Sequence, residues 1–170
     1  MNILILNGSP RPEGNTAALV KGFKEGAVSK GHEVKVINVG NLKINGCVAC
    51  EYCHEKGNGK CVFEDDMKPV YDALDTADVV VFASPVYYWG FSGQLQSAIT
   101  RFYAPNVPKA RKYALLLSSQ SPGVYDGIIS QYRSMLGYFG AESAGIVTAA
   151  GDENKSPAKI KEACTLGAGL

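Results

Sequence analysis

Five short, strongly apolar runs, separated by segments with helical spacing, constrain the fold more than any other feature of this sequence. A run such as Val79–Ala83 (VVVFA) lacks polar alternation, which is typical of a strand buried on both faces. Between the runs, apolar residues recur every three or four positions, as they do on one face of a helix. This alternation predicts a doubly wound α/β fold whose five-stranded parallel sheet is built through right-handed crossovers.

The expected elements follow one another along the whole chain, without repeats or linkers. We expect strands over Met1–Leu6, His32–Val39, Val79–Ala83, Tyr113–Ser118 and Ser143–Ala149. We expect helices over Thr16–Lys30, from an Asp66 N-cap to about Thr76, over Gly93–Phe102 and Tyr125–Phe139, and from a Ser156-Pro157 start to about Thr165. The tail LGAGL is expected to fray.

Length and charge narrow the class of protein. A chain of 170 residues predicts one domain, with a core large enough to be stable without disulfides. The net charge of +1, with both signs scattered, argues against a nucleic-acid partner. No apolar run reaches the roughly 20 residues of a membrane span. The first residues do not read as a signal peptide, so we expect a cytoplasmic protein without a membrane partner.

The loop after the first expected strand, NGSPRPEGNT (Asn7–Thr16), leads into a helix N-terminus. It matches neither the nucleoside-triphosphate P-loop nor the G-x-G-x-x-G fingerprint of dinucleotide sites. Small residues, hydroxyls, an amide and one arginine remain. Free backbone N–H groups at the positive end of a helix favour a phosphate there. The simpler interpretation is that Asn15 or Thr16 only caps the helix, while Gly8 and Pro10 only form turns.

The loop after the third expected strand, SPVYYWGFSGQL (Ser84–Leu95), contains three consecutive aromatic residues, Tyr87, Tyr88 and Trp89. Three adjacent aromatics on a loop cannot all point into one core, so at least one should face solvent, a partner or a flat ligand. A dimer contact is the alternative to a ligand platform. A phosphate anchor and an aromatic platform together suggest a planar ring on a phosphorylated tail.

Four of the five cysteines lie in CVACEYCHEKGNGKC (Cys47–Cys61), with the spacing C-x2-C-x2-C-x7-C. Residues 41–65 show little periodicity and are long for a connection, so we expect a functional or metal-organised insertion. A reducing compartment and an odd cysteine count argue against disulfides. Zinc usually takes two separated cysteine pairs rather than three cysteines in a row. A metal cluster, zinc and uncoordinated thiols remain open from the residues alone.

Three segments together resemble a known family. GSPRPEGNT, SPVYYWGFSGQLQSAI and the intervening CVACEYCHEKGNGKCVFEDDM are similar to segments of the NADPH-dependent FMN reductases and related flavodoxin-like flavoproteins. The resemblance extends over about the first 105 residues. It implies a flavodoxin-like sheet of order 2-1-3-4-5 and non-covalently bound FMN. It also implies NAD(P)H as a possible electron donor, and homodimers or homotetramers.

The resemblance also assigns residues to the flavin site, position by position. The phosphate would be held by Ser9, Arg11, Asn15 and Thr16. The flavin ring and its ribityl chain would be lined by Pro85, Val86, Tyr87, Tyr88, Trp89 and Gly90. Ser119 and Gly123 would close the far side, although SSQSPG departs from the glycine-rich pattern of the family. No catalytic side chain is expected, because the flavin carries the redox chemistry.

The cysteine segment is similar to one subset of this family, the iron–sulfur flavoproteins of anaerobes. This resemblance implies a [4Fe–4S] cluster held by Cys47, Cys50, Cys53 and Cys61. The spacing suits it: two-residue gaps keep three thiolates together, and Gly57 and Gly59 let the fourth return. Asp65 and Asp66 are interpreted as helix-capping residues, Cys164 as an ordinary packed residue, and His54 as an unneeded ligand.

The sequence therefore predicts an FMN-dependent oxidoreductase that passes electrons between FMN and a cluster, with a small-molecule or protein donor and acceptor. A plain NAD(P)H-dependent FMN or quinone reductase, with structural or empty cysteines, is the first alternative. A binding module built on a zinc knuckle is the second.

Overall fold

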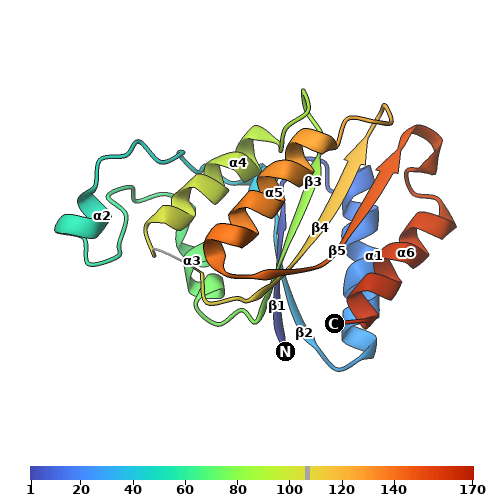
Figure 1. Ribbon diagram of the computed structural model, residues 1–170, viewed down its shortest axis with the longest axis horizontal. Coiled ribbons are helices and arrows are strands. Elements are labelled where there is room, and N and C mark those ends of the chain that lie inside the picture. Colours follow the sequence, from blue (N-terminus) through green and yellow to red (C-terminus); the bar gives the residue numbers. More distant parts are fainter. Residues whose placement is uncertain (106–107) are drawn as a thin grey trace.

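A five-stranded parallel sheet of order β2-β1-β3-β4-β5 runs through the protein (Figure 1). The computed structural model describes residues 1–105 and 108–170. Every neighbouring pair of strands is parallel. The strands are β1 (Asn2–Asn7), β2 (Glu33–Ile37), β3 (Val79–Pro85), β4 (Lys112–Ser119) and β5 (Glu142–Ala150). The predicted fold class and strand order are thus confirmed.

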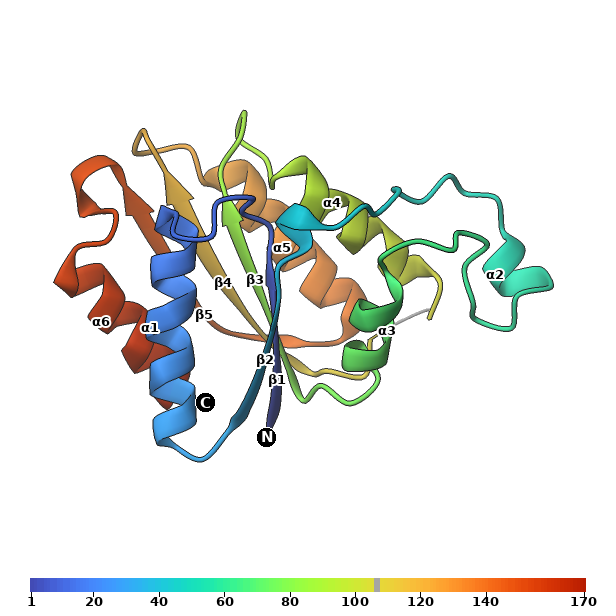
Figure 2. The same ribbon diagram turned by 180° about the vertical axis from the view of Figure 1, so that it is seen from behind.

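Helices cover both faces of the sheet. Figures 1 and 2 show α1 and α6 on one face, with α3, α4 and α5 on the other. The α-helices are α1 (Asn15–Ser29), α2 (Tyr52–Glu55), α3 (Lys68–Leu74), α4 (Gly93–Thr100), α5 (Asp126–Phe139) and α6 (Pro157–Ala168). Short 3-10 turns are η1 (Val39–Asn41), η2 (Arg101–Tyr103) and η3 (Gly151–Glu153). No helix among the described residues is long and apolar enough to cross a membrane.

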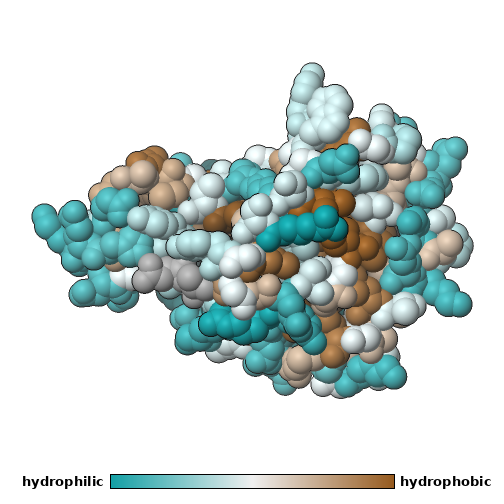
Figure 3. Space-filling model, in the orientation of Figure 1, coloured by the Kyte–Doolittle hydropathy of each residue, from teal (hydrophilic) through white to brown (hydrophobic). Residues whose placement is uncertain are grey.

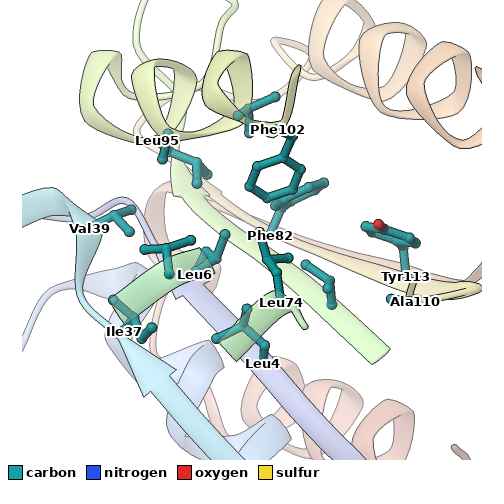
Figure 4. Close-up of a cluster of buried hydrophobic side chains, with 14 of the residues drawn as sticks. Leu4, Leu6, Ile37, Val39, Leu74, Phe82, Leu95, Phe102, Ala110 and Tyr113 are labelled. Atoms are coloured by element: carbon teal, nitrogen blue, oxygen red, sulfur yellow. The ribbon is translucent and has the colours of Figure 1, made fainter. Parts of the chain in front are cut away.

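The core is split by the sheet into two layers, as unbroken apolar strands require. Under α3, α4 and α5, Phe82 of β3 lies at the centre of an aromatic group (Figure 4). Its ring centroid is 6.1 Å from that of Phe102 and 5.7 Å from that of Tyr113. The layer under α1 and α6 is mainly aliphatic, with Phe23 packed among residues such as Leu19 and Ala163.

The close packing of α1 against α6 corrects the expectation that the chain end frays. α6 continues to Ala168, and Gly167 is buried. A Cβ on Gly167 would collide with the backbone of Phe23, and a Cβ on Gly26 would collide with that of Cys164. The glycines let the two backbones touch, so the last helical turn is held by α1. The Ser156 cap is confirmed, because its hydroxyl accepts a hydrogen bond from the Lys159 N–H at 3.3 Å.

The predicted cap of α3 is wrong. Met67, not Asp66, is the N-cap residue, and no side chain caps the helix. The Asp66 carboxylate instead accepts a hydrogen bond from the Lys43 N–H at 2.8 Å. Asp66 is used to join the two ends of the cysteine-containing segment rather than to begin the helix.

The segment from Gly46 to Glu64, here called the cysteine arm, stands out from the body of the protein. Figures 1 and 2 both show α2 beyond the end of the three-helix layer, away from the carboxyl ends of the strands. The arm thus occupies a different side of the molecule from the loops that follow β1, β3 and β4.

Candidate functional site

Strand register brings together the starts of the loops that follow β1, β3 and β4. The Gly8 N–H donates to the carbonyl oxygen of Ala83 at 2.8 Å, and the Val86 N–H donates to that of Ser118 at 2.8 Å. These bonds continue the β1–β3 and β3–β4 ladders past the strands. Ligands of open α/β sheets bind at this edge, beyond the carboxyl ends of the strands.

The loop after β1 leaves the N-terminus of α1 without a side-chain cap. Gly14 is the N-cap residue, so the interpretation of Asn15 or Thr16 as the cap is wrong. Ser9 is buried and its hydroxyl accepts a hydrogen bond from the Arg11 N–H at 3.3 Å. The Arg11 side chain is exposed and Asn15 is half-buried. The first turn of α1 therefore keeps N–H groups that no side chain of the helix start accepts, as a phosphate site requires.

Thr16 differs from its three predicted partners because its side chain bonds to a different strand of the sheet rather than to its own loop. It is buried, and its hydroxyl lies 2.7 Å from the hydroxyl of Ser118 at the end of β4. This bond ties the start of α1 to the β4 edge. The sequence pattern gives no reason to select Ser118, which is only the polar end of an apolar run.

The loop after β3 forms a tight hairpin whose tip presents the three aromatic residues. Tyr87 and Gly90 pair through two backbone hydrogen bonds of 3.1 and 3.0 Å. Between them, Tyr88 and Trp89 both adopt left-handed backbone conformations, with φ of 48° and 60°. Tyr88 is 98% exposed and Trp89 61%. Figure 3 shows this tip clear of the surrounding surface. The expectation that at least one of these aromatics faces away from the core is thus confirmed.

The backbone of that hairpin tip is costly. Such turns normally use Asn-Gly, because non-glycine residues in this region cost about 1–2 kcal/mol each. Strained residues of this kind cluster at functional sites. Below the tip, the Ser92 N–H donates to the Ser84 hydroxyl at 2.9 Å, so the base of the hairpin is fixed.

The loop after β4 is held by hydroxyl groups. The Ser119 hydroxyl lies 2.7 Å from the carbonyl oxygen of Ser121 and 2.6 Å from the Tyr125 hydroxyl. The Asn154 side chain donates to the carbonyl oxygen of Ser119 at 2.7 Å. Gly123 is exposed and has a φ of 75°. Ser119 therefore shapes this loop, and Tyr125 and Asn154 are supporting residues that the sequence pattern gave no reason to select.

In the cysteine arm, Cys47, Cys50, Cys53 and Cys61 line one narrow hollow. Its wall also includes Val48, Val62, Phe63, Arg101 and Tyr103. Cys47 and Cys50 are exposed, Cys61 is half-buried and Cys53 is buried. Burial and the neighbouring Cys61 and Cys47 thiols raise the pKa of Cys53. The four predicted ligands thus line the same hollow.

Backbone geometry between the cysteines is unusual. Ala49 and Glu51, which alternate with the cysteines, both have a positive φ, 53° and 57°. The turn points the Ala49 N–H at the Cys47 sulfur, 3.4 Å away. An N–H group directed at sulfur suits a thiolate that carries negative charge.

The glycines of the arm make an ordered turn rather than a loose hinge. Gly57 packs against Tyr52 so closely that a Cβ would collide with that ring and with the backbone of Lys60. Gly59 has a φ of 83°, and its N–H donates to the carbonyl oxygen of Cys53 at 2.8 Å. This turn directs the chain from α2 back toward Cys61.

The root of the arm is closed by a buried ion pair that sequence reasoning missed. Nη1 of Arg101 donates to Asp65 Oδ2 at 2.8 Å and to the carbonyl oxygen of Asn45 at 2.9 Å. The arginine and aspartate side chains are 1% and 8% exposed. Burial alone would raise the pKa of Asp65, but hydrogen bonds from Arg101, Asn45 and Met67 outweigh it and hold that pKa below its ordinary value. Asp65 is therefore mainly a partner of Arg101, not a capping residue.

The arm also contacts the end of α4 and the η2 turn that follows it. The Cys47 N–H donates to the Thr100 hydroxyl at 3.1 Å, and the Tyr103 hydroxyl donates to the Glu51 carboxylate at 2.9 Å. The His54 ring contacts Tyr103, with Nε2 lying 3.0 Å from its carbonyl oxygen. His54 is thus occupied by the protein, in keeping with its interpretation as an unneeded ligand.

Within residues 1–105 and 108–170, no three His, Cys, Asp or Glu side chains lie close enough to hold one metal ion. The four cysteines share a hollow without forming a single-ion site. Their closer convergence around a cluster, and their proximity to a flavin, stay predictions.

The sheet order and the helices on both faces define a flavodoxin-like protein, with an added cysteine arm. The family model described as NADPH-dependent FMN reductase matches residues 1–153. The chain belongs to this family.

Curated relatives match a little over half of the chain. An iron-sulfur flavoprotein of Methanocaldococcus jannaschii is 36% identical over 101 residues, which cover 59% of this chain and 51% of that protein. An iron-sulfur flavoprotein of Methanosarcina thermophila is 31% identical over 101 residues, covering 59% of this chain and 52% of that protein. The match thus spans about half the length of these relatives.

Solved structures share the fold over the whole chain. An NAD(P)H:quinone oxidoreductase from Methanothermobacter marburgensis has a TM-score of 0.74 at 20% identity, covering 99% of this chain and 94% of that one. An azoreductase from Bacillus anthracis has a TM-score of 0.73 at 17% identity, covering all of both chains. At these identities the likeness establishes the fold alone.

Proposed function

We propose that this protein is an FMN-dependent oxidoreductase that passes electrons between FMN and a [4Fe–4S] cluster held by Cys47, Cys50, Cys53 and Cys61. The observation that carries the proposal is the arrangement of these four cysteines around one hollow, in a chain of the FMN reductase family. The iron-sulfur flavoprotein names of the relatives support it. We treat residues 1–170 as one FMN-binding domain, with the cysteine arm as its insertion.

The flavin side of the proposal uses the sheet edge. The uncapped N-terminus of α1 supplies N–H groups and the positive end of the helix dipole, and the exposed Arg11 supplies a cation. Ser9 and Asn15 lie on the same loop. Thr16 contributes by fixing the loop to Ser118 rather than by an exposed hydroxyl. Pro85 to Gly90 would line the ring, and Ser119 and Gly123 the far side.

The cluster side of the proposal uses the arm. When bound, FMN accepts two electrons as a hydride and releases them singly, which suits a one-electron cluster. The protein's own contribution is to place the thiolates, direct an N–H at Cys47 and keep Cys53 from water. NAD(P)H or a protein serves as donor or acceptor, in the cytoplasm.

The position of the arm favours electron transfer between copies of the chain. The arm lies away from the strand ends, where the flavin loops gather (Figure 1). Contact between the arm of one copy and the flavin edge of another, in a homodimer or homotetramer, would bring cluster and flavin together. The exposed hairpin tip at Tyr88 and Trp89 is the part of the flavin edge most available for such a contact.

A plain NAD(P)H-dependent FMN or quinone reductase is the second candidate. It is favoured by the exposure of Cys47 and Cys50 and by the lack of a formed single-ion site within the described residues. In that case the arm is structural.

The visible spectrum of anaerobically purified protein distinguishes the two, together with chromatography of the cofactor released by heat. The proposal expects FMN, and a broad brown shoulder that dithionite bleaches and that a variant with all four arm cysteines changed to Ser lacks. A flavin spectrum identical in the wild type and that variant would support the plain reductase. Recovery of FAD would overturn the FMN assignment.

A further inference from the structure

A buried cation with unused hydrogen-bond donors lies at the root of the cysteine arm. Arg101 belongs to η2 and its side chain is 1% exposed. Its Nη1 is satisfied by Asp65 and Asn45. Its Nε and Nη2 are buried as well, yet neither finds a hydrogen-bond partner in the described part of the chain. Buried donors are normally paired, so these two point to an acceptor that the chain itself does not provide.

The surroundings of Arg101 indicate where that acceptor lies. The residue forms part of the wall of the hollow lined by the four arm cysteines. The guanidinium carbon lies 5.2 Å from the ring centroid of Phe63 and 5.9 Å from that of Tyr71. The rings flank the guanidinium. The Tyr71 hydroxyl donates to the carbonyl oxygen of Arg101 at 3.2 Å and makes no hydrogen bond to Nε or Nη2.

The other charged groups near Arg101 are already committed. The Asp65 carboxylate is bonded to Nη1 and to backbone N–H groups. The Glu51 carboxylate, also on the hollow, accepts from the Tyr103 hydroxyl. Among the side chains that line the hollow, the remaining acceptors are the cysteine sulfur atoms, together with whatever sulfur atoms belong to the group that they bind.

We propose that Arg101 is a positioning residue for the group held by the arm cysteines, donating Nε–H and Nη2–H to its sulfur atoms and raising its reduction potential. This inference rests on the proposed function, because it requires the cysteines to hold an iron–sulfur cluster. It goes beyond that function by assigning control of the cluster's potential to a residue of α4's C-terminal extension, forty positions along the chain from Cys61.

The direction of the effect follows from charge. Four thiolates make the cluster anionic, and reduction adds another negative charge. A fixed cation and N–H···S hydrogen bonds stabilise the reduced form more than the oxidised form, so they raise the potential. Asp65 acts in the opposite sense, because its carboxylate is a fixed negative charge at the same root.

The two members of the ion pair therefore give a test that separates charge from structure. Arg101→Gln should lower the cluster's midpoint potential by at least one tenfold change in the reduction equilibrium, which is about 59 mV for one electron. Asp65→Asn should raise it. If the substitutions only loosened the root of the arm, the midpoint potentials of both variants would shift in the same direction. Arg101→Lys keeps the positive charge but loses the planar set of N–H donors of the guanidinium. Its midpoint potential should therefore lie between those of the wild type and Arg101→Gln. Arg133→Gln, an exposed arginine on α5, is the matched control and should leave the potential unchanged.

The measurement is a reductive titration followed by electron paramagnetic resonance, on protein reconstituted anaerobically with iron and sulfide. Iron, sulfide and flavin contents are determined for every variant. If Arg101→Gln does not take up iron, Arg101→Lys carries the test, and a midpoint below wild type supports the inference. If the wild-type protein binds the cluster and the Arg101 variants have the same midpoint potential as the Arg133→Gln control, the inference is overturned while the proposed function stands. Shifts of the midpoint potential with the same sign in the Arg101 and Asp65 variants would also overturn the inference. Wild-type protein that takes up no cluster overturns the proposed function and this inference together.

Discussion

The loops after β1, β3 and β4, which we propose bind the flavin and call the flavin loops, and the cysteine arm are built by different means. The loops at the sheet edge begin where neighbouring strands end, and ladder-like bonds such as Gly8 to Ala83 fix their starting points. The arm has no strand on either side, and side chains hold it at its root and along the end of α4. A site placed by a sheet tolerates changes in single side chains. A site placed by a few buried polar contacts depends on each of them.

The largest effect that separates the two regions is expected from the arm cysteines. Replacing any one of Cys47, Cys50, Cys53 or Cys61 by Ser should remove most of the iron and leave flavin content nearly unchanged, because the flavin loops do not contact the arm's hollow. Iron, acid-labile sulfide and FMN assays on anaerobic preparations measure this. The fifth cysteine provides the control: Cys164→Ser lies on α6 and should retain full iron. Equal loss of iron and FMN would show that the two sites are not independent.

Breaking the arm's root is expected to have the next largest effect. Asp65→Asn leaves a buried Arg101 without its charged partner, which costs about 3–5 kcal/mol of unfolding free energy. Urea unfolding measures the change. Lys68→Ala is the control, since its pair with Asp72 is exposed and contributes about 0–1 kcal/mol.

The same pair predicts a pH dependence. The pKa of Asp65 is lower in the folded protein than in the unfolded chain. Its contribution is therefore complete above the unfolded pKa and is lost as the pH falls through the folded pKa. Wild-type stability should decrease more steeply than that of Asp65→Asn at acidic pH. Parallel curves would remove Asp65 from the acid transition.

At the sheet edge, Arg11→Ala should weaken FMN more than riboflavin, since only FMN has the phosphate. A hydrogen bond to a charged group contributes about 1.5–3 kcal/mol, or roughly 10- to 150-fold in affinity. Fluorescence titration of the apoprotein with each flavin measures both constants. Equal losses for the two flavins would take Arg11 out of the phosphate site.

The smallest effect is expected at the hairpin tip. Changing Tyr88-Trp89 to Asn-Gly supplies residues that accept both left-handed conformations, so unfolding free energy should rise by about 1–2 kcal/mol. Flavin binding or self-association should weaken, because the exposed aromatic rings are lost. A variant that is more stable, yet unchanged in both, would show that the aromatic tip has no binding role.

What the sequence predicts also differs between the sheet and the cysteine arm. Sheet order, strands and helices are predictable because unbroken apolar runs and helical spacing are local signals, and the family resemblance gives the order. Arg101 escapes prediction because its partner Asp65 is 36 positions away and nothing in the sequence marks the residue as buried. Asp66 does not act as the predicted cap, because its carboxylate accepts a hydrogen bond from the Lys43 N–H instead. The role of Ser118 likewise depends on a hydrogen bond with Thr16, a residue distant in the sequence.

The central claim is that FMN and a cluster accept electrons in one protein, and counting electrons tests it most directly. Anaerobic wild-type protein, loaded with FMN and reconstituted with iron and sulfide, is titrated with dithionite while both absorbances are followed. The account predicts about three electrons per chain, two for the flavin and one for the cluster, and about two per chain in the variant with all four arm cysteines changed to Ser. Two electrons in both proteins, with zinc or no metal bound to the wild type, would contradict it.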